Sequence, residues 1–312
     1  MKAVGIMNHG GPEVLEVLDL PDINAGPGQI RIRNFAASVN PVDVSVRNGS
    51  MAQMQKVNPP PYIPGMDAAG VIDQIGEDVE TDLKVGDSVM AMVVPSGDHG
   101  AYKENIVLDK NAIVRAPRDT THAQASTLPM NSLTARLSLD LLGLEEGQVL
   151  AVTGSPGAYG GYVVQLAKAD GLTVIADSND SDKDLLTSLG VDVIIPRGDG
   201  FAERVRQEFP NGVDGIADGA LLNESAIEAV KDGGSFTSVR GFKGEPQREI
   251  EFTATWVTAY DCKKDKLETL CKQAEEGILS LRVAETVEMH NASKAHKKLE
   301  AGGTRGRMVI EF

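Results

Sequence analysis

The 312-residue sequence has little that could form a disulfide or hold a metal ion. Its two cysteines, Cys262 and Cys271, fall in one segment of helical pattern, which argues against a bridge between them. No CxxC, HxxxH or four-cysteine cluster is present, so the ligand spacing that holds zinc is missing. The five histidines are scattered, and we expect each to be a surface or cap residue.

Positive charge and long apolar runs are also scarce. Lysine and arginine number 30 against 45 aspartates and glutamates, for a formal net charge of −15. A chain of this sign disfavours nucleic acid and anionic membranes as partners, because both attract basic surfaces. No apolar run is long enough to span a bilayer or to form a signal peptide. Together with the scarcity of cysteine, this predicts a cytoplasmic location.

What is present fits two domains, since the length is sufficient for two separate cores. The first part, up to about residue 115, is predicted to be β-rich. Residues 29–38 alternate apolar and polar side chains as a half-buried strand does, and 68–76 and 87–94 are further candidate strands. Residues 57–65 carry four prolines and are expected to form an extended loop. Short strands separated by Gly/Pro turns indicate a barrel-like domain.

The middle of the chain alternates short apolar strands with amphipathic helices. This order predicts an α/β fold, with a parallel sheet covered on both faces and a nucleotide at the carboxyl ends of the strands. The predicted strands are 148–154, 172–177, 191–195, 213–220 and 234–239, and the predicted helices are 159–171, 182–190, 201–209 and 224–233. The tail is expected to form a long helix over 262–279 and a final strand over 306–312, which could return to the first domain.

A glycine-rich stretch, TGSPGAYG, follows the first strand of this middle part and opens its first helix. Glycine lets the backbone approach a dinucleotide pyrophosphate, and the helix N-terminus supplies positive potential. The spacing is not a regular GxGxxG, because Ser155 takes the first glycine position, and the alternative is a plain structural turn. Because it lies in the first of five strand–helix units, we favour a binding loop formed by Ser155, Pro156, Gly157, Ala158, Tyr159 and Gly160.

Several ordered segments carry a family resemblance. VTGSPGAYGGYVVQLAKADG, ASVNPVDVSVRNG, IPGMDAAGVIDQIGEDV, LKVGDSVMA, STLPMNSLTA and RGRMVIEF resemble, in order, motifs of the medium-chain dehydrogenase/reductase superfamily, in its zinc-free quinone oxidoreductase (zeta-crystallin-like) branch. The resemblance implies a GroES-like β-barrel catalytic domain, residues 1–120 and 259–312, and a Rossmann doubly wound parallel sheet, residues 121–258. It also implies a cofactor cleft between them.

The resemblance also bears on the reaction. Zinc-dependent relatives have a cysteine ligand and a Gly-His-Glu unit where this chain has Asn40 and Gly65-Met66-Asp67, and amide and thioether groups do not replace thiolate and imidazole on zinc. This implies a zinc-independent oxidoreductase that transfers hydride from NADPH to a quinone or an α,β-unsaturated carbonyl compound. One alternative is a non-enzymatic NADPH-binding protein with a structural or redox-sensing role. Another, an RNA-binding protein, is disfavoured by the negative charge.

The choice between NADPH and NADH depends on the end of the second Rossmann strand. Asp177 lies near the position that reads the ribose 2′-hydroxyl and favours NADH. In the family alignment, however, Ser178 takes the diagnostic position, with Asn179 beside it. Lys183 matches a lysine that binds the 2′-phosphate in relatives, and the guanidinium of Arg197 suits a phosphate. We therefore expect NADPH, with NADH as the alternative.

The substrate-side candidates come mainly from the resemblance. Asn40 is implied to lie in the cleft, although it could equally be a turn residue before Pro41. Thr134 matches a threonine near the nicotinamide amide, or it bonds its own helix backbone. Tyr62 could cap the substrate pocket, or it is a surface aromatic residue. Strand ends that would face the cofactor contribute Gly219, Ala220, Val239 and Arg240.

A small-molecule electrophile is the expected partner, and a homodimer is the expected assembly. Trp256 and Tyr260 follow the last sheet strand, where packing in the core is the simpler expectation and a subunit contact the alternative. No residue of the sequence stands out as a general acid, and we expect water to deliver the proton.

Overall fold

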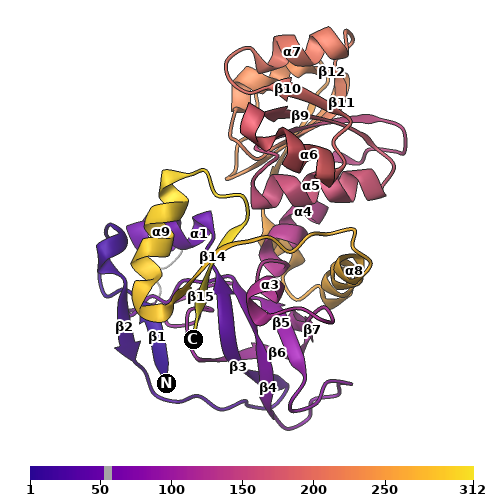
Figure 1. Cartoon of the computed structure of the whole chain (residues 1–312). Coiled ribbons are helices and arrows are strands. Elements are labelled where there is room, and N and C mark those ends of the chain that lie inside the picture. The colour runs from indigo at the N-terminus through magenta and orange to yellow at the C-terminus, as the bar shows by residue number, and fades with distance from the viewer. Residues whose placement is uncertain (53–57) are drawn as a thin grey trace. The chain divides into compact units, whose positions relative to one another are not determined.

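The computed structural model describes residues 1–52 and 58–312 (Figure 1). Val57, the first residue of the predicted proline-rich loop, lies outside the described residues. The chain forms two compact units: Met1–Met130 with Tyr260–Glu276 and Leu281–Phe312, and Asn131–Ala259 with Gly277–Ser280. Among the described residues, no helix combines the length and apolar character that crossing a membrane requires.

The first unit is built on a sheet of order β14-β15-β3-β4-β5-β7, with β6 paired to β3, and on the separate pair β1-β2. All pairs are antiparallel except β14 with β15. The strands are β1 (Lys2–Gly5), β2 (Glu16–Asp19), β3 (Gln29–Ser38), β4 (Asp67–Ile75), β5 (Ser88–Met92), β6 (Asn105–Asp109), β7 (Ile113–Arg115), β14 (Val283–Glu288) and β15 (Arg307–Glu311). The helices are α1 (Pro41–Asn48), α3 (His122–Ala125), α8 (Lys264–Glu275) and α9 (Ala292–Ala301), with short 3-10 turns η1 (Pro12–Val14), η2 (Lys110–Ala112) and η6 (Met289–Asn291).

Strand β3 has the bounds predicted from its alternating pattern. Ile30, Ile32 and Asn34 point into the core, and the Asn34 amide is satisfied there by three backbone groups, those of Ala69 in β4 and of Ala101 and Lys103 before β6. The final strand, β15, pairs antiparallel with β3, so the tail does return to the first unit. The predicted long tail helix is shorter than expected: α8 begins at Lys264 and ends at Glu275.

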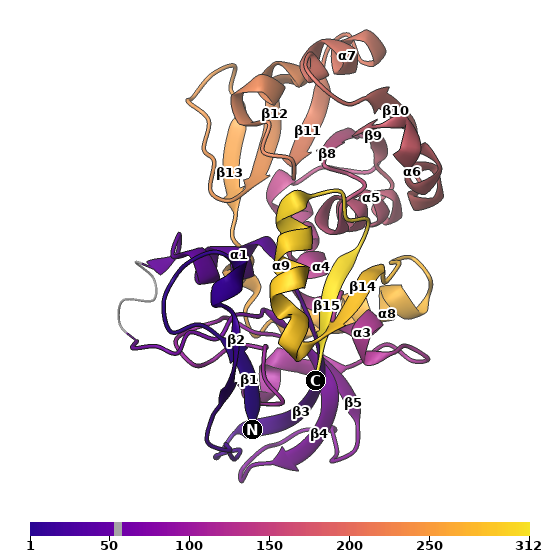
Figure 2. The same cartoon turned by 60° about the vertical axis from the view of Figure 1, so that its left-hand side comes forward.

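The second unit holds a parallel sheet of order β10-β9-β8-β11-β12-β13 (Figure 2). Its strands are β8 (Val149–Thr153), β9 (Thr173–Ser178), β10 (Val193–Pro196), β11 (Val213–Asp218), β12 (Val230–Val239) and β13 (Glu251–Thr255). Its helices are α4 (Pro129–Leu142, starting at the unit boundary), α5 (Ala158–Ala169), α6 (Lys183–Leu189) and α7 (Phe201–Glu208), with 3-10 segments η3 (Asp180–Asp182), η4 (Asn223–Ala229) and η5 (Val257–Tyr260). Helix α5 packs on β8 and β9 and contacts α6. The strand order reverses beside β8, as the predicted doubly wound topology requires.

One predicted helix is wrong. Residues 224–233 were expected to be helical, but η4 ends at Ala229 and β12 begins at Val230, which pairs with Val213. The register then shifts before Gly215 pairs with Ser235. The extra residues around Gly233, which has a φ of +71°, are therefore taken up in a bulge of the strand. Burial of Val230 in the sheet therefore outweighs the helical spacing of apolar residues over 224–233.

Candidate functional site

The glycine-rich loop joins β8 to α5 at the carboxyl end of the sheet. Gly157 is the N-cap of α5, and it offers no side chain to the first turn of that helix. The first backbone N–H groups of a helix have no acceptor within that helix. In α5 they follow a glycine-rich loop whose N-cap residue has no side chain. A helix start of this kind binds a negatively charged group, such as a pyrophosphate.

The glycines of this loop are required by close contacts. A Cβ on Gly160 would lie 2.5 Å from the carbonyl oxygen of Gly154 and 2.7 Å from the Cα of Ser155. Gly154 itself has a φ of +66°, which favours glycine. A Cβ on Gly157, by contrast, would meet only the carbonyl oxygen of Gly154, at 3.1 Å. Missing side chains thus leave backbone accessible where a dinucleotide pyrophosphate would approach, and the residues present fit that group.

A buried carboxylate connects this loop to the end of β11. Asp218 accepts hydrogen bonds from the Thr153 hydroxyl and from the backbone N–H groups of Leu222 and Asn223. The Thr153 oxygen accepts in turn from the N–H of Ala220 at 3.0 Å. Sequence reasoning predicted Gly219 and Ala220 but missed Asp218 and Thr153. A carboxylate that ends a buried apolar strand is the signal that could have found Asp218.

Tyr159 is fixed by α4 and by the end of β11. Its ring packs so closely on Gly219 that a Cβ there would lie 2.8 Å from Tyr159 Cδ1. Its hydroxyl shares a hydrogen bond with Ser138 Oγ at 2.7 Å, and Ser138 also bonds Thr255. Burial raises the pKa of Tyr159 above its ordinary value, so the phenol stays protonated at neutral pH.

The candidates for binding the adenosine ribose, at the ends of β9 and β10, already have partners within the protein. The Ser178 hydroxyl donates to the carbonyl of Asn179, which is exposed. Lys183 pairs with Asp180 at 2.8 Å on the surface. Arg197, after β10, donates from Nε to Asp177 at 2.8 Å. Of the two candidates at the end of β12, Val239 is half-buried, and Arg240 is exposed with a φ of +65°.

Asn40 lies in a buried polar cluster of the first unit. It is the N-cap of α1, its N–H donates to Asp43, and its side-chain amide donates to Asp67 at 2.7 Å. Asp67 also accepts from the N–H of Met130. Burial raises the pKa of Asp43 to about 7 and that of Asp67 to about 6. The structure thus gives Asn40 a helix-capping role, and its place in a substrate cleft stays a prediction.

The other two substrate-side candidates also have structural partners. Tyr62 pairs with Ile6 through the backbone, stacks on His9 with ring centroids 5.2 Å apart, and donates to the carbonyl of Asn58. Thr134 is buried in α4, where its carbonyl accepts from the Ser138 hydroxyl at 3.0 Å. Tyr62 belongs with Asn40 to the first unit, whereas Thr134 and the cofactor candidates belong to the second.

His296 corrects the expectation that every histidine is a surface or cap residue. It is fully buried in α9, which packs on α1 (Figure 2). Its Nε2 lies 3.3 Å from the Tyr102 hydroxyl, and its Nδ1 lies 3.5 Å from Nη1 of Arg47, which also forms a bidentate pair with Glu300. Burial, aided by Arg47, lowers the pKa of His296 to about 3. No local pattern distinguishes a buried histidine on a helix of mixed polarity from an exposed one.

The described residues do not fit a zinc ion. Nowhere in the described ranges do three or more His, Cys, Asp or Glu side chains gather in a way that could hold a metal. Asn40 and Asp67 hydrogen-bond each other, and Met66, which is buried, carries a thioether. These groups are poor zinc ligands, and we derive no step through a metal.

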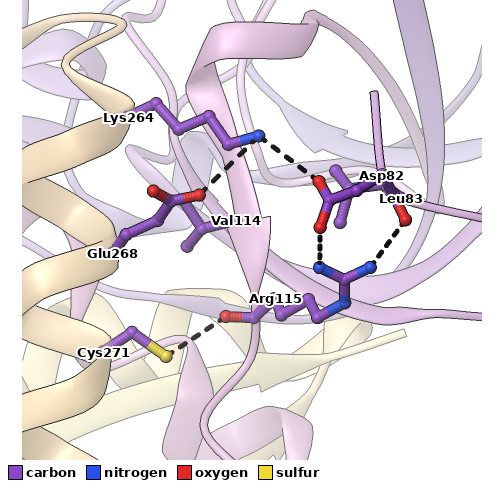
Figure 3. Close-up of a pocket in the computed structure, with 7 residues that line it drawn as sticks. All are labelled: Asp82, Leu83, Val114, Arg115, Lys264, Glu268 and Cys271. Atoms are coloured by element: carbon purple, nitrogen blue, oxygen red, sulfur yellow. Dashed lines mark hydrogen bonds and ion pairs between the residues drawn. The ribbon is translucent and has the colours of Figure 1, made fainter. Parts of the chain in front are cut away.

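A shallow pocket of about 190 Å³ lies elsewhere in the first unit (Figure 3). Its charges satisfy one another, because Arg115 binds Asp82 while Lys264 lies between Asp82 and Glu268. The Cys271 thiol donates to the Arg115 carbonyl, and burial raises its pKa to about 11, so it is not a reactive thiolate. We assign no ligand to this pocket, which is lined by Asp82, Leu83, Val114, Arg115, Lys264, Glu268 and Cys271.

Known proteins resemble this chain in sequence and in fold. The family model for the alcohol dehydrogenase GroES-like domain matches residues 26–118, and the model for zinc-binding dehydrogenases matches residues 189–310. Over 251 residues, or 77% of the chain, the sequence is 30% identical to a 2-methylene-furan-3-one reductase from Solanum lycopersicum and to a chloroplastic NADPH-dependent alkenal/one oxidoreductase from Arabidopsis thaliana. The chain covers 62% and 63% of these two plant proteins, less than two thirds of their length.

Other relatives match over the full length. A quinone oxidoreductase from Pseudomonas aeruginosa is 25% identical, over 99% of both chains. The crystal structure of an NAD-dependent alcohol dehydrogenase superposes with a TM-score of 0.89 at 28% identity, covering all of both chains. The quinone oxidoreductase from Coxiella burnetii gives a TM-score of 0.87 at 27% identity, over 100% of this chain and 99% of that one. The predicted pairing of a GroES-like domain with a Rossmann sheet is confirmed, and the chain belongs to the medium-chain dehydrogenase/reductase superfamily of nicotinamide-dinucleotide oxidoreductases, in which it resembles the quinone oxidoreductases.

Proposed function

We propose that this protein is an NADPH-dependent reductase of quinones or α,β-unsaturated carbonyl compounds. The observation that carries the proposal is the bare main chain at the start of α5, where the contacts of Gly160 and the left-handed backbone of Gly154 both require glycine. Similarity to a quinone oxidoreductase and to an NADPH-dependent alkenal/one oxidoreductase supports the class of acceptor. The amide of Asn40 and the thioether of Met66 are poor zinc ligands, and a quinone or enone suits a site with such groups because its own π-system spreads the incoming charge.

In this proposal the second unit holds the cofactor. The residues that would hold the pyrophosphate are Ser155, Pro156, Gly157, Ala158, Tyr159 and Gly160. Those that would hold the adenosine ribose are Ser178, Asn179, Lys183 and Arg197. The nicotinamide half would be held by Gly219, Ala220, Val239 and Arg240, at the ends of β11 and β12. Strand ends of a doubly wound sheet converge on one ligand, which supports this assignment.

The bound NADPH supplies the hydride, and the chain supplies position and protection from water. We propose that Asn40, Tyr62 and Thr134 orient the nicotinamide and the acceptor. The Asn40 amide is held rigid by its bond to Asp67. We propose water as the source of the proton that completes the reduction, since the carboxyl groups of Asp43 and Asp67 are fully buried and hydrogen-bonded within the first unit.

The test is a panel of small quinones and enones mixed with the purified protein and NADPH, with loss of reduced-nicotinamide absorbance as the readout. Turnover with at least one acceptor, at a rate that depends on protein concentration, is the expected result. Tight NADPH binding without turnover across the whole panel would instead favour a structural or redox-sensing role. A protein that neither binds nor oxidises NADPH would contradict the proposal.

We also propose a cytoplasmic homodimer, formed along β13. Within the described part of the chain β13 pairs only with β12, so its outer edge can accept a strand from a second copy. Trp256, expected in the core, is instead 55% exposed directly after this strand, as a subunit contact requires. Light scattering coupled to size-exclusion chromatography would give twice the mass of one chain.

A further inference from the structure

We propose that Asp177 does not read the ribose of the cofactor but acts as a positioning residue, which sets a preference for NADPH by orienting Arg197. This inference rests on the proposed NADPH-dependent function and deepens it. It reverses the role that an acidic residue at the end of the second Rossmann strand is expected to play.

Both carboxylate oxygens of Asp177 already accept from the protein. Oδ1 accepts from the backbone N–H of Gly154 at 3.2 Å, and Oδ2 accepts from Nε of Arg197 at 2.8 Å. The backbone carbonyl of Asp177 also accepts from the Ser155 hydroxyl at 3.0 Å. One residue therefore connects the start of the glycine-rich loop with the guanidinium after β10.

Exposure decides which member of the pair can meet a ligand. The Asp177 side chain is 5% exposed, whereas the Arg197 side chain is 33% exposed. Nε of Arg197 is committed to Asp177, and the structure records no acceptor among the described residues for its two terminal nitrogens. These two nitrogens have the fork geometry that binds a phosphate, and the bond at Nε limits rotation of the guanidinium plane. Arg197 is thus oriented for a 2′-phosphate by a carboxylate that has almost no surface of its own.

A comparable carboxylate lies between the same two strands at the opposite, amino end of the sheet, with its cation supplied by helix α5. Asp192, directly before β10, pairs with Lys168 at 2.7 Å and also accepts from the backbone N–H of Val174 at the start of β9. It combines one cation and one backbone donor, as Asp177 does. Because it lies at the end of the sheet away from the nucleotide, Asp192→Asn should affect folding alone and serves as the control.

The experiment compares wild type, Asp177→Asn, Arg197→Met, the double variant and Asp192→Asn. NADPH and NADH are each titrated by fluorescence, and kcat/KM is measured for each with one acceptor. We expect Asp177→Asn and Arg197→Met each to lower kcat/KM for NADPH about tenfold and for NADH less than twofold. The double variant should be no worse than Arg197→Met, because both changes remove one contact. Asp192→Asn should leave the NADPH/NADH ratio unchanged.

Two further measurements keep the test independent of turnover and of folding. Adenosine 2′,5′-bisphosphate and AMP are used as competing ligands, and Asp177→Asn should weaken only the first. Arg197→Lys keeps the charge but loses the fork, and we expect it to lose most of the NADPH preference. If Arg197→Lys retains the full preference, charge alone suffices and the positioning role is wrong.

An opposite change of the NADPH/NADH preference in Asp177→Asn would also overturn the inference. If Asp177 reads the ribose hydroxyls, its loss lowers use of NADH selectively and raises the relative use of NADPH. That result leaves the reductase function intact, since wild type still turns over. If wild type neither binds nor oxidises NADPH, the proposed function itself fails, and the two failures are therefore distinguishable.

Discussion

The buried polar cluster of the first unit and the glycine-rich loop of the second unit use their polar groups in opposite ways. In the first unit, polar side chains are buried and satisfy one another, as Asp43 does with Tyr102 and as Arg47 does with Glu300. At the carboxyl end of the second unit's sheet, the loop from Gly154 to Gly160 presents main chain, with Arg197 half-exposed beside it. A closed polar network stabilises one fold, whereas bare backbone with a nearby cation leaves a place for an anion.

This contrast predicts which changes affect ligand binding and which affect stability. Substitutions in the loop of the second unit should change cofactor affinity more than folding. Substitutions in the buried network of the first unit should change the free energy of unfolding and its pH dependence. The predictions below test this separation.

The largest effect is expected for Gly160→Val. A side chain there collides with the carbonyl of Gly154, so the loop must move out of its binding geometry. We expect NADPH affinity to fall at least ~100-fold, which corresponds to about 3 kcal/mol. Fluorescence titration of NADPH measures this, and circular dichroism checks that the variant remains folded.

Gly147→Ala is the control at the other end of β8. Gly147 has a φ of +84° but no atom within 4 Å of a built Cβ, so alanine adds backbone strain without a clash. We expect the variant to lose about 1 kcal/mol of stability while the Kd for NADPH stays unchanged. Equal loss of affinity in both variants would mean that the loop has no special role.

An intermediate effect is expected from His296→Gln as the pH falls. The pKa of His296 is about 3 in the folded protein against 6.5 for the free side chain, so the unfolded chain binds a proton that the folded chain does not. Its stabilising contribution is complete above pH 6.5 and is lost progressively as the pH falls from 6.5 toward 3. The stability advantage of wild type over the variant should shrink on the order of 1 kcal/mol per pH unit in this window.

Urea unfolding at a series of pH values measures this difference. The variant isolates the histidine, because the raised pKa values of Asp43 and Asp67 affect both proteins and act in the other direction. Those carboxyl groups lose their stabilising contribution as the pH rises from their ordinary pKa of 3.8 toward about 6 for Asp67 and about 7 for Asp43. A difference between wild type and variant that does not change with pH would show that His296 is not buried as a neutral group.

The smallest effect is expected for Tyr159→Phe. The change removes one hydrogen bond to Ser138, which keeps its bond to Thr255, while the ring still packs on Gly219. Stability should fall by about 1 kcal/mol and the Kd for NADPH should change less than ~threefold. A tenfold loss of affinity without loss of stability would instead place the hydroxyl on the cofactor.

Local patterns predicted most of the fold. The alternation in β3 and the strand–helix order after residue 148 were informative because each element buries one regular face. The helix predicted over 224–233 failed because pairing of Val230 with Val213 depends on a distant strand. Trp256 and His296 were also assigned wrongly, because burial is decided by tertiary packing and neither position has a local signal.

The sequence points to candidate-site residues most clearly where backbone geometry requires a residue type. Gly154 and Gly160 stand out in the sequence because the loop needs residues without a side chain at these two positions. The contacts of Asp218 with Thr153 and of Asp177 with Arg197 link strand ends far apart in the chain, and no local spacing encodes them.

The most direct test of the central claim is a crystal structure of the whole chain with NADPH bound. We predict that the pyrophosphate accepts hydrogen bonds from backbone N–H groups between Ser155 and Gly160, with the terminal nitrogens of Arg197 on the 2′-phosphate. A cofactor bound elsewhere, or a loop whose binding position is filled by the Tyr159 side chain at saturating NADPH, would contradict the account.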